Sequence, residues 1–588
     1  MCGIFGALNT NKENPHNISA LAYSKREAIL DSLRHRGEDG EGIFKSEQCF
    51  LAHTRLAILD PLPRAAQPYT LGDITLVFNG EIYNYRELAK KYDLTLETSS
   101  DTEVVIRLYE LLGDQFVELL DGMFALGIYD KRNGTKLLLA RDRAGEKPLY
   151  YTRDTRGIAF ASTTKALLTS RISSKNLNKQ ALWDFFTFLW IPEPATIFED
   201  IFALPPGHIL VFERKNIEIK AFKNRFHAPL SEGKSSRESI RNMVTNAIKA
   251  RLLSDVKIGA FLSGGVDSSI VCAIAHEEIP DLATFSVGFL DDFDPYTGYA
   301  DETKYAESVA RFLGTQHHSI MIKARDFEML LKDFVRFCDQ PFGVISALGV
   351  LCVAKEAKKR GIKVLLSGDG ADEVFGGYPW HVKVRNNPPT INPEKPKGWH
   401  YYATQKQKSE FLCEESFKYC ASSLRFLLNN LDATPKEYLL HDLEFYLKNE
   451  MMSKLDRMTM AYSIEGRAAF VAPKLLEFAE YVDYEWLLSI ESEKPRLKEA
   501  FDDLLPAEVF SRPKHGFNPP INHWLKHEWL GILKESLSKD SCLFKYNILS
   551  AASAERFWKY FREDECGGSI GFCFIVLNMW LRELEEEL

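Results

Sequence analysis

The chain has 588 residues, 45% of them hydrophobic, which is enough for more than one domain with a large core. Its net charge of −9 is spread along the sequence, which favours solubility and argues against nucleic acid as the dominant partner. No apolar run could span a bilayer, no signal-peptide pattern follows the first residues, and the ten cysteines are dispersed without a CxxC pair. These features predict a cytoplasmic protein with reduced thiols and no membrane partner, and they are compatible with a homodimer.

The second residue is a cysteine, and removal of Met1 would place a thiol and a free amine on one residue. The thiolate is the attacking form of cysteine, and an N-terminal amine titrates near neutrality. The amine can therefore accept the thiol proton, which makes Cys2 a candidate nucleophile. The alternative is a small apolar residue in a buried first strand, and Cys2 alone does not decide between the two.

Two later segments add polar groups that suit an amide substrate. An apolar strand ends in Asn79-Gly80, whose side-chain amide and backbone N–H could donate to a developing oxyanion. By itself this could also be an ordinary Asn-Gly turn. Arg55 and Asp101 could bind the α-carboxylate and the α-ammonium of an amino acid.

The first block, from Met1 to about Phe212, alternates short β-rich runs with Gly and Pro turns. The strands expected in it are Thr75–Asn79, Met123–Tyr129 and Lys136–Ala140, and the helices are Ser24–Leu33 and Asp101–Leu112. This pattern predicts an α+β sandwich of two β-sheets flanked by helices.

Together with Arg34-His35-Arg36-Gly37-Glu38-Asp39, these motifs resemble the glutaminase domain of class II, N-terminal-nucleophile glutamine amidotransferases. The resemblance implies that Cys2 attacks the side-chain amide of glutamine, forms a thioester and releases ammonia, with Asn79 and Gly80 as the oxyanion hole. It assigns glutamine binding to Arg55, Leu56, Ala57, Ile58, Leu59, Asn79, Gly80, Glu81 and Asp101. Glu38 departs from the proline usual in the family, but it lies outside this set.

A polar, aperiodic stretch is expected to separate two domains. We place the glutaminase domain at residues 1–212, the linker at 213–236 and a second domain at 237–588.

In the second block, strands expected at Lys257–Leu262, Ala283–Val287 and Lys363–Leu366 alternate with helices. This alternation predicts an α/β, doubly wound parallel sheet with a nucleotide at its carboxyl edge. The part beyond about Leu440 is expected to be mainly helical. The proline-rich segment Asn386–Gly398 could form part of a lid or be an exposed loop.

The string Ser263-Gly264-Gly265-Val266-Asp267-Ser268 joins the first of these strands to a helix. Backbone N–H groups and a helix N-terminus placed in this way surround a phosphate, and the serine hydroxyls, including that of Ser269, can add donors. Asp267 could hold magnesium. The string lacks the Gly-Lys-Ser/Thr ending of a Walker A loop.

A matching strand ends in Ser367-Gly368-Asp369-Gly370-Ala371-Asp372, where Asp372 could complete the magnesium site. A solvated acidic loop is the alternative. Both loops resemble those of ATP pyrophosphatases that cleave ATP between the α and β phosphates.

Both sets of motifs in this order, with Lys454-Leu455-Asp456-Arg457, resemble glutamine-hydrolysing asparagine synthetases over most of the chain. The resemblance implies ATP as co-substrate with Mg²⁺, Asp369 acting on the intermediate, and Lys494 stabilising the transition state. It assigns ATP binding to Leu262, Ser263, Gly264, Gly265, Asp267, Ser268, Val287, Ser367 and Gly368, and the metal to Asp267 and Asp372.

The implied reaction passes ammonia from glutamine along a protected route to an adenylated carboxylate. If the carboxylate is that of aspartate, the products are asparagine, AMP, pyrophosphate and glutamate. Aspartate-specific members carry a Thr-Thr-x-Arg-Ala-Ser segment, but this chain has no arginine in Asp339–Ala347. It also differs at Asp369, usually glutamate, and within Glu465–Ala472.

An amidotransferase acting on another carboxylate, such as a uronic acid of a surface glycan, therefore stays open as the alternative. A regulatory or scaffolding protein with degenerate sites is a third interpretation. The joint presence of Cys2, Asn79, Asp267 and Asp372 argues against it.

Overall fold

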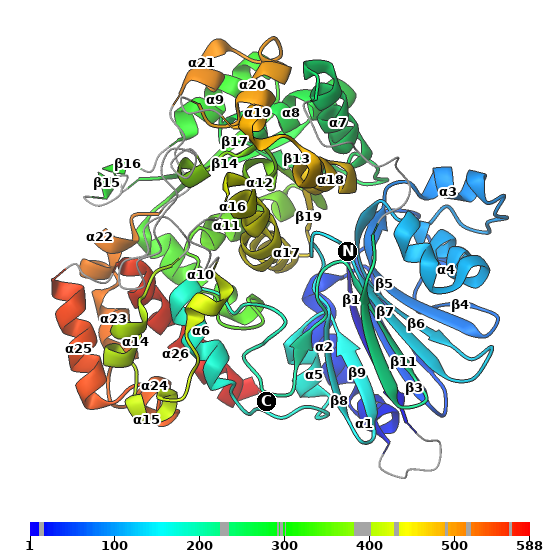
Figure 1. The fold of residues 1–588 in the computed structure, drawn as a ribbon, viewed down its shortest axis with the longest axis horizontal. Coiled ribbons are helices and arrows are strands. Elements are labelled where there is room, and N and C mark those ends of the chain that lie inside the picture. Colours follow the sequence, from blue (N-terminus) through cyan, green and yellow to red (C-terminus); the bar gives the residue numbers. More distant parts are fainter. Residues whose placement is uncertain are drawn as a thin grey trace.

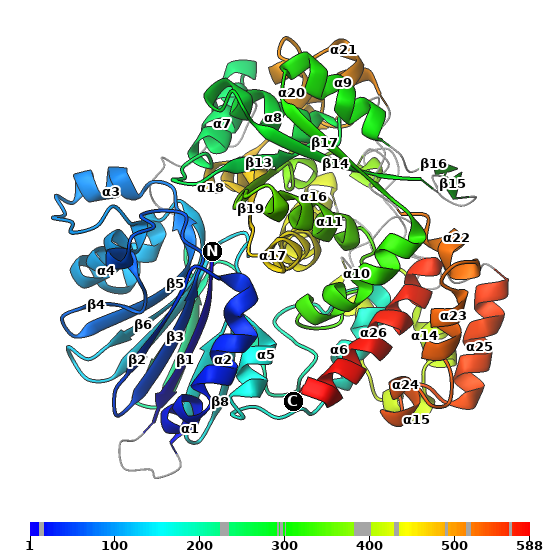
Figure 2. The ribbon, with the colours of Figure 1, turned by 180° about the vertical axis from the view of Figure 1, so that it is seen from behind.

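The computed structural model describes residues 1–10, 17–223, 235–290, 302–381, 401–427, 434–488, 492–512, 519–563 and 567–587, with the backbone of 293–294 and 298–299. The fold has a two-sheet first domain, a parallel-sheet second domain, and a helical group beside both (Figures 1 and 2). The segment Asn386–Gly398 and most of the expected linker lie outside the described residues.

The first domain is a four-layer sandwich of two six-stranded antiparallel sheets between helices. The sheet orders are β10-β8-β9-β1-β3-β2 and β12-β11-β7-β6-β5-β4. The strands are β1 Cys2–Asn9, β2 Gly40–Lys45, β3 Cys49–Arg55, β4 Tyr69–Leu71, β5 Ile74–Ile82, β6 Gly122–Asp130, β7 Lys136–Arg141, β8 Tyr150–Asp154, β9 Gly157–Ala161, β10 Phe202–Ala203, β11 His208–Glu213 and β12 Asn216–Ala221. Helices α1 Ile18–Ser24, α2 Arg26–Leu33 and α5 Thr164–Thr169 cover the first sheet, and α3 Tyr85–Lys91 and α4 Asp101–Leu112 the second.

Strand β1 shows why the sheets stack as they do. Successive side chains of a strand point to opposite faces. Ile4 and Leu8 lie in the core between the two sheets, whereas Phe5 and Ala7 pack under the helices. Both faces of β1 are therefore buried, and the position that follows Met1 is fixed inside the protein.

Most predicted elements of this domain are present, and α4 has the predicted bounds, with the Ser100 hydroxyl capping its N-terminus. The helix predicted at Ser24–Leu33 is present as α2, which begins at Arg26, and a separate helix, α1, precedes it and ends at Ser24. Strand β12 pairs with β11 inside the segment expected as a linker, so the sheet of the first domain extends to Ala221.

The second domain contains a five-stranded sheet, all of whose neighbouring strands are parallel, in the order β17-β14-β13-β18-β19. The strands are β13 Ile258–Phe261, β14 Ala283–Phe289, β17 Gln316–Ile322, β18 Val364–Ser367 and β19 Glu465–Ala468. Helices α7 Arg237–Ala250, α8 Val266–Glu278 and α9 Thr303–Leu313 lie on one face, and α10 Ala324–Phe337, α11 Ala347–Lys359 and α17 Met452–Met460 on the other (Figure 2). The doubly wound sheet is thus confirmed.

Strand β19 interrupts the part that was expected to be mainly helical. The remaining helices are α6 Lys179–Phe188, α12 Ala371–Phe375, α14 Gln405–Phe411, α15 Glu414–Phe417, α16 Pro435–His441, the π-helix Asp442–Met451, α18 Pro473–Tyr481, α19 Tyr484–Leu487, α20 Pro495–Phe501, α21 Ala507–Ser511, α22 Ile521–Lys526, α23 Leu530–Ser536, α24 Cys542–Lys545, α25 Ala551–Arg562 and α26 Gly568–Glu587. Among the described helices, none has both the length and the apolar character needed to cross a bilayer.

A buried ionic contact joins the two domains. Asp456 on α17 accepts hydrogen bonds from both terminal nitrogens of Arg36, at 2.9 and 3.1 Å, and lies 3.4 Å from Lys147 Nζ. Burial raises the pKa of Asp456, but the two cations outweigh burial and hold it below its usual range. Asp456 therefore ties α17 of the second domain to two cations of the first domain.

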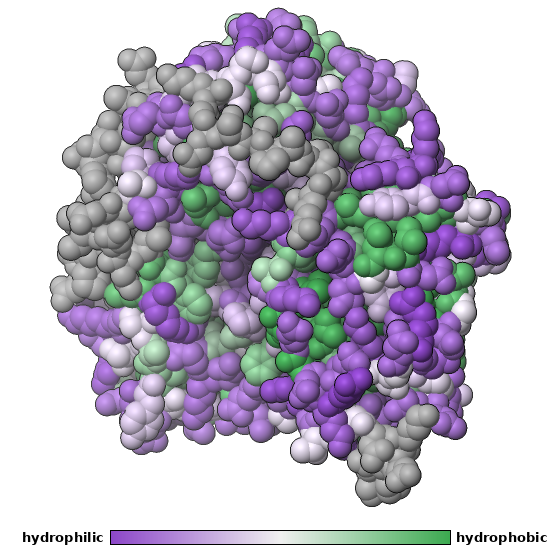
Figure 3. Space-filling model, turned by 45° about the vertical axis from the view of Figure 1, so that its right-hand side comes forward, coloured by the Kyte–Doolittle hydropathy of each residue, from purple (hydrophilic) through white to green (hydrophobic). Residues whose placement is uncertain are grey.

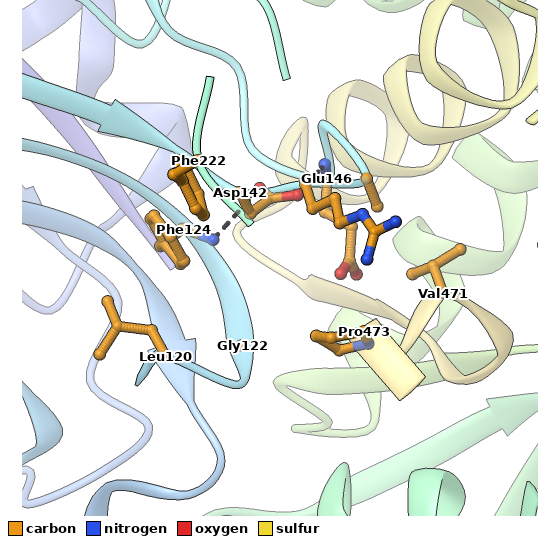
Figure 4. Close-up of a pocket in the computed structure, with 10 residues that line it drawn as sticks. Leu120, Gly122, Phe124, Asp142, Glu146, Phe222, Val471 and Pro473 are labelled. Carbon is orange, nitrogen blue, oxygen red and sulfur yellow. Dashed lines mark hydrogen bonds between the residues drawn. The ribbon is translucent and has the colours of Figure 1, made fainter. Parts of the chain in front are cut away.

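A small cavity of about 10 Å³ lies in the same interface, with room for about one water molecule. Asp142 and Glu146 border it from the first domain, and Val471 and Pro473 from the second (Figure 4). Burial raises the pKa of Glu146 to about 8, and its Oε2 has no hydrogen-bond partner among the described residues.

Candidate active sites

Cys2 begins β1 and pairs in register with Arg55 on β3. Its backbone N–H donates to Asn79 Oδ1 at 2.9 Å. Burial raises the pKa of the thiol, while the nearby N-terminal ammonium and Arg55 lower it. The ammonium of Met1 lies 2.9 Å from Oε2 of Glu465, so the chain start reaches β19 of the second domain.

The predicted oxyanion hole lies beside Cys2, on β5. Nδ2 of Asn79 is buried and has no acceptor among the described residues. Gly80 must be glycine, because a Cβ there would lie 2.1 Å from the carbonyl oxygen of Met123. A buried donor without a partner is costly, so Asn79 Nδ2 is suited to an acceptor supplied by a ligand.

The charged residues of the predicted glutamine clamp lie around this point. The Arg55 guanidinium donates to carbonyl oxygens of the following loop, at 2.9 Å to Leu62 and 2.5 Å to Asp60. Asp101 starts α4 and accepts from the backbone N–H of Ile82 at 2.9 Å.

Burial raises the pKa of Asp101 to about 6. Burial and then Asp101 raise the pKa of Glu81 well above its usual value, and Arg467 Nη2 of the second domain lies 4.0 Å from Glu81 Oε1.

The loop Leu56–Leu59, also assigned to glutamine binding, divides between two cores. Leu56 and Ile58 belong to a hydrophobic cluster that is formed mostly by the second domain, whereas Leu59 packs in the first. The Leu56 N–H donates to the carbonyl oxygen of Met1 at 3.0 Å. This loop therefore shapes the domain interface as well as the surroundings of Cys2.

The second site is a cavity of about 770 Å³ at the carboxyl edge of the parallel sheet. Its lining includes the following predicted ATP-binding residues: Leu262, Ser263, Gly265, Asp267, Ser268, Val287, Ser367 and Gly368. Gly264 and Ser269 do not line it. Gly264 has φ +75°, and a Cβ there would meet the backbone of Tyr305 at 2.6 Å. Figure 3 shows that the molecular surface is hollowed near the centre of that view, with hydrophobic side chains beside the hollow.

Three of the predicted residues meet at one point of this cavity. Lys494 Nζ lies 2.7 and 2.6 Å from the two carboxylate oxygens of Asp267 and 2.8 Å from Asp372 Oδ1. Burial lowers the pKa of Lys494, but the two carboxylates outweigh burial and raise it above its usual value. Asp369 lies nearby, with Oδ2 accepting from the Ser367 hydroxyl at 2.6 Å.

The cavity also contains residues to which we assigned no role from the sequence. Lys454, Glu450 and Tyr446 line it from the π-helix and α17, and Tyr378 and Trp380 stack with ring centroids 4.2 Å apart. Lys454 stands in the motif Lys454-Leu455-Asp456-Arg457, and Glu450 lies four residues before it, a spacing that places two side chains on one face of a helix. This spacing was the signal in the sequence that Glu450 and Lys454 lie together.

Comparison with known proteins agrees with this architecture. A family model for a glutamine amidotransferase domain matches residues 1–223, and the family model for asparagine synthase matches residues 239–582. The two domains thus define a glutamine-dependent, ATP-consuming ligase.

Individual relatives extend over most of the chain. A protein of Bacillus subtilis named asparagine synthetase [glutamine-hydrolyzing] 1 is 30% identical over 597 residues, covering 93% of this chain and 92% of that protein. A putative asparagine synthetase [glutamine-hydrolyzing] 2 of Methanocaldococcus jannaschii is 37% identical over 409 residues, covering 65% and 76%. An asparagine synthetase [glutamine-hydrolyzing] 2 of Arabidopsis thaliana is 28% identical, covering 92% and 82%. The chain belongs to the asparagine synthase family.

Proposed function

We propose that the protein makes asparagine from aspartate, with glutamine as nitrogen donor and ATP converted to AMP and pyrophosphate. The observation that carries the proposal is the convergence of Asp267, Asp372 and Lys494 beside the Ser-Gly-Gly loop, in one cavity with Asp369. The names of the relatives support aspartate as acceptor, and no observation specifically favours a uronic acid.

The first half-reaction takes place at Cys2 after removal of Met1. The α-amine accepts the thiol proton, and the thiolate attacks the side-chain carbonyl carbon of glutamine. Asn79 Nδ2 and the Gly80 N–H stabilise the oxyanion, ammonia leaves, and water hydrolyses the thioester to glutamate. Arg55 and Asp101 bind the α-carboxylate and α-ammonium of glutamine.

Magnesium fits the second site as a partner of the nucleotide. Asp267 and Asp372 offer hard carboxylate oxygens, which Mg²⁺ prefers. The described residues contain no group of three or more His, Cys, Asp or Glu able to hold a metal, so oxygens of the bound phosphates would complete its coordination. When bound, the ion would offset negative charge on the phosphates. Lys494 would contact the same phosphates, while Leu262 and Val287 contact adenosine.

In the second half-reaction, the side-chain carboxylate of aspartate attacks the α-phosphorus, and pyrophosphate leaves. Ammonia then attacks the acyl carbon, AMP leaves, and Asp369 accepts a proton from the attacking nitrogen. Because ammonia is mostly protonated and unreactive in neutral water, the two sites need a protected route between them. The buried domain interface supports such a route.

Two further expectations accompany this function. We place the enzyme in the cytoplasm, which the nine free thiols among the described residues support. Association into a homodimer stays a prediction.

The test supplies the purified protein with MgATP, glutamine and aspartate, and measures asparagine, glutamate, AMP and pyrophosphate. We expect all four products. ADP and phosphate as the primary products would contradict the assignment of the second domain. Amidation of a uronic acid without formation of asparagine would move the proposal to the alternative acceptor.

A further inference from the structure

Four basic side chains line the 770 Å³ cavity in the described part of the chain: Lys454, Lys494, Lys498 and Arg512. Three of them belong to the phosphate side. Lys494 and Lys498 are electrostatically close to Asp267. Arg512 donates to the carbonyl oxygen of Gly264, at 3.5 Å.

Lys454 is the fourth cation, and it lies elsewhere in the cavity. It comes from α17, and only 8% of the residue is exposed. Its hydrogen bond with the described residues is to the thioether of Met451, at 3.2 Å. Glu450 and Asp369 are electrostatically close to it, but no carboxylate of the described residues makes a hydrogen bond or an ion pair within 4.0 Å with its ammonium. Sulfur is a weak acceptor, and a buried ammonium whose three donors lack good acceptors is costly. Lys454 is therefore suited to bind an anionic group of a ligand.

Glu450 is the anionic neighbour of Lys454. It lies four residues earlier, near the end of the π-helix Asp442–Met451, so both side chains line the cavity from one side. Tyr446 donates to Glu450 Oε1 at 3.0 Å. The carboxylate thus has one oxygen held by the protein and can accept from a ligand at the other.

Aromatic packing fixes this carboxylate. The ring of Tyr446 lies 5.7 Å from that of Tyr378, and Tyr378 donates to Glu373 Oε1 at 2.8 Å. Tyr378 also stacks on Trp380. Tyr446, the hydrogen-bond donor to Glu450, is therefore held by packing before any ligand binds.

We propose that Lys454 and Glu450 form a clamp for an α-amino acid, with Lys454 binding the α-carboxylate and Glu450 the α-ammonium of the acceptor. The clamp leaves the side-chain carboxylate of the acceptor to face Asp369 and the nucleotide. It supplies the cation missing from the segment Asp339–Ala347. This inference rests on the proposed function and narrows the acceptor to α-amino acids with a side-chain carboxylate, since a uronic acid has no ammonium group for Glu450.

Two analogues of aspartate test the two halves of the clamp separately. β-Alanine lacks only the α-carboxylate, and succinate lacks only the α-ammonium. With an ammonium salt as nitrogen donor, we expect wild-type enzyme to prefer aspartate over both in kcat/KM. Lys454→Gln should reduce the preference over β-alanine by roughly 10- to 100-fold, and Glu450→Gln should reduce the preference over succinate similarly, because each loses one charged hydrogen bond.

Matched controls come from the same helical stretch. Lys448 and Glu444 pair with each other at 2.5 Å and do not line the cavity. Lys448→Gln and Glu444→Gln remove the same charges, and they should leave both preferences unchanged. Lys454→Arg should retain most of the preference over β-alanine.

Unchanged preferences in both cavity variants would overturn the clamp while leaving the proposed function intact. Failure of wild-type enzyme to consume aspartate at all would instead overturn the proposed function. If a glutamine variant does not fold, wild-type enzyme still decides, since equal kcat/KM for aspartate and β-alanine would rule out Lys454 as the α-carboxylate anchor.

Discussion

The site around Cys2 and the cavity around Lys494 hold their polar groups in opposite ways. Beside Cys2, the buried Nδ2 of Asn79 and Oε2 of Glu81 make no hydrogen bond with the described residues. In the cavity, Asp267 and Asp372 are both paired with Lys494. The first arrangement suits a neutral amide on which charge appears only during reaction, and the second suits a polyanion that arrives with its own cation.

The largest effect should come from breaking the first site alone. We expect Cys2→Ala to abolish glutamine-dependent synthesis, because no other nucleophile starts β1, while synthesis with an ammonium salt survives. The measurement compares asparagine formed with each nitrogen donor. Undiminished glutaminase activity in this variant would remove Cys2 from the proposed mechanism.

The converse change should break only the second site. Asp267→Asn removes one of the two carboxylates that face Lys494, so formation of AMP and pyrophosphate should fall by roughly 100-fold or more. Glutamine hydrolysis should continue, since Cys2 is in the other domain. Asp281→Asn, on the turn between α8 and β14, provides a control that leaves the cavity unchanged. Equal loss of both activities would mean that the two sites are not separable.

The contact between the two domains can be weakened at Asp456, next to the first site, because Nε of its partner Arg36 donates to the Cys2 carbonyl oxygen at 3.3 Å. Asp456→Asn leaves Arg36 and Lys147 buried without a full counter-charge, which should cost about 3–5 kcal/mol of the free energy of unfolding. Because the folded pKa of Asp456 lies below its unfolded value, the contribution is present above the unfolded pKa and disappears as pH falls through the folded one.

Thermal unfolding at neutral pH measures this loss, with the exposed Asp31→Asn as control. We also expect fewer molecules of asparagine per glutamine hydrolysed, since the same contact aligns the two domains. A variant as stable and as well coupled as wild type would show that Asp456 does not hold the domains together.

Sequence motifs indicated groups that stand beside glycine in or directly after a strand. Asn79 precedes Gly80 within β5, and Asp267 follows a glycine pair after β13. Lys494 lies before α20 and was assigned from the family resemblance, and it meets Asp267 in the cavity. Their catalytic roles remain predictions. Local patterns are informative here because close approach of the backbone restricts the residue types, as at Gly80.

Other features depend on contacts that a local pattern does not contain. Arg36 and Asp456 are 420 residues apart. Strand β19 has the sequence Glu-Gly-Arg-Ala, with no β-branched residue, and exists because β18 pairs with it. The spacing of Glu450 and Lys454 indicates a shared helix face, but the π form of the helix Asp442–Met451 has no sequence signature of its own.

The smallest expected effect concerns the acceptor side of the cavity. Burial raises the pKa of Glu450 to about 7, with Asp369 also raising it and Lys454 and Tyr446 lowering it. If only the carboxylate binds the α-ammonium of aspartate, the ionised fraction rises from about a tenth at pH 6 to about nine tenths at pH 8. The KM for aspartate should therefore fall roughly tenfold over this range, measured at saturating glutamine and MgATP. Glu450→Gln cannot titrate, so its KM should be higher and nearly flat, while Glu444→Gln should follow wild type. A wild-type KM that does not change with pH would show that Glu450 does not bind the ammonium group. The contrast with the site around Cys2 would then rest on the charged groups around Lys494 alone.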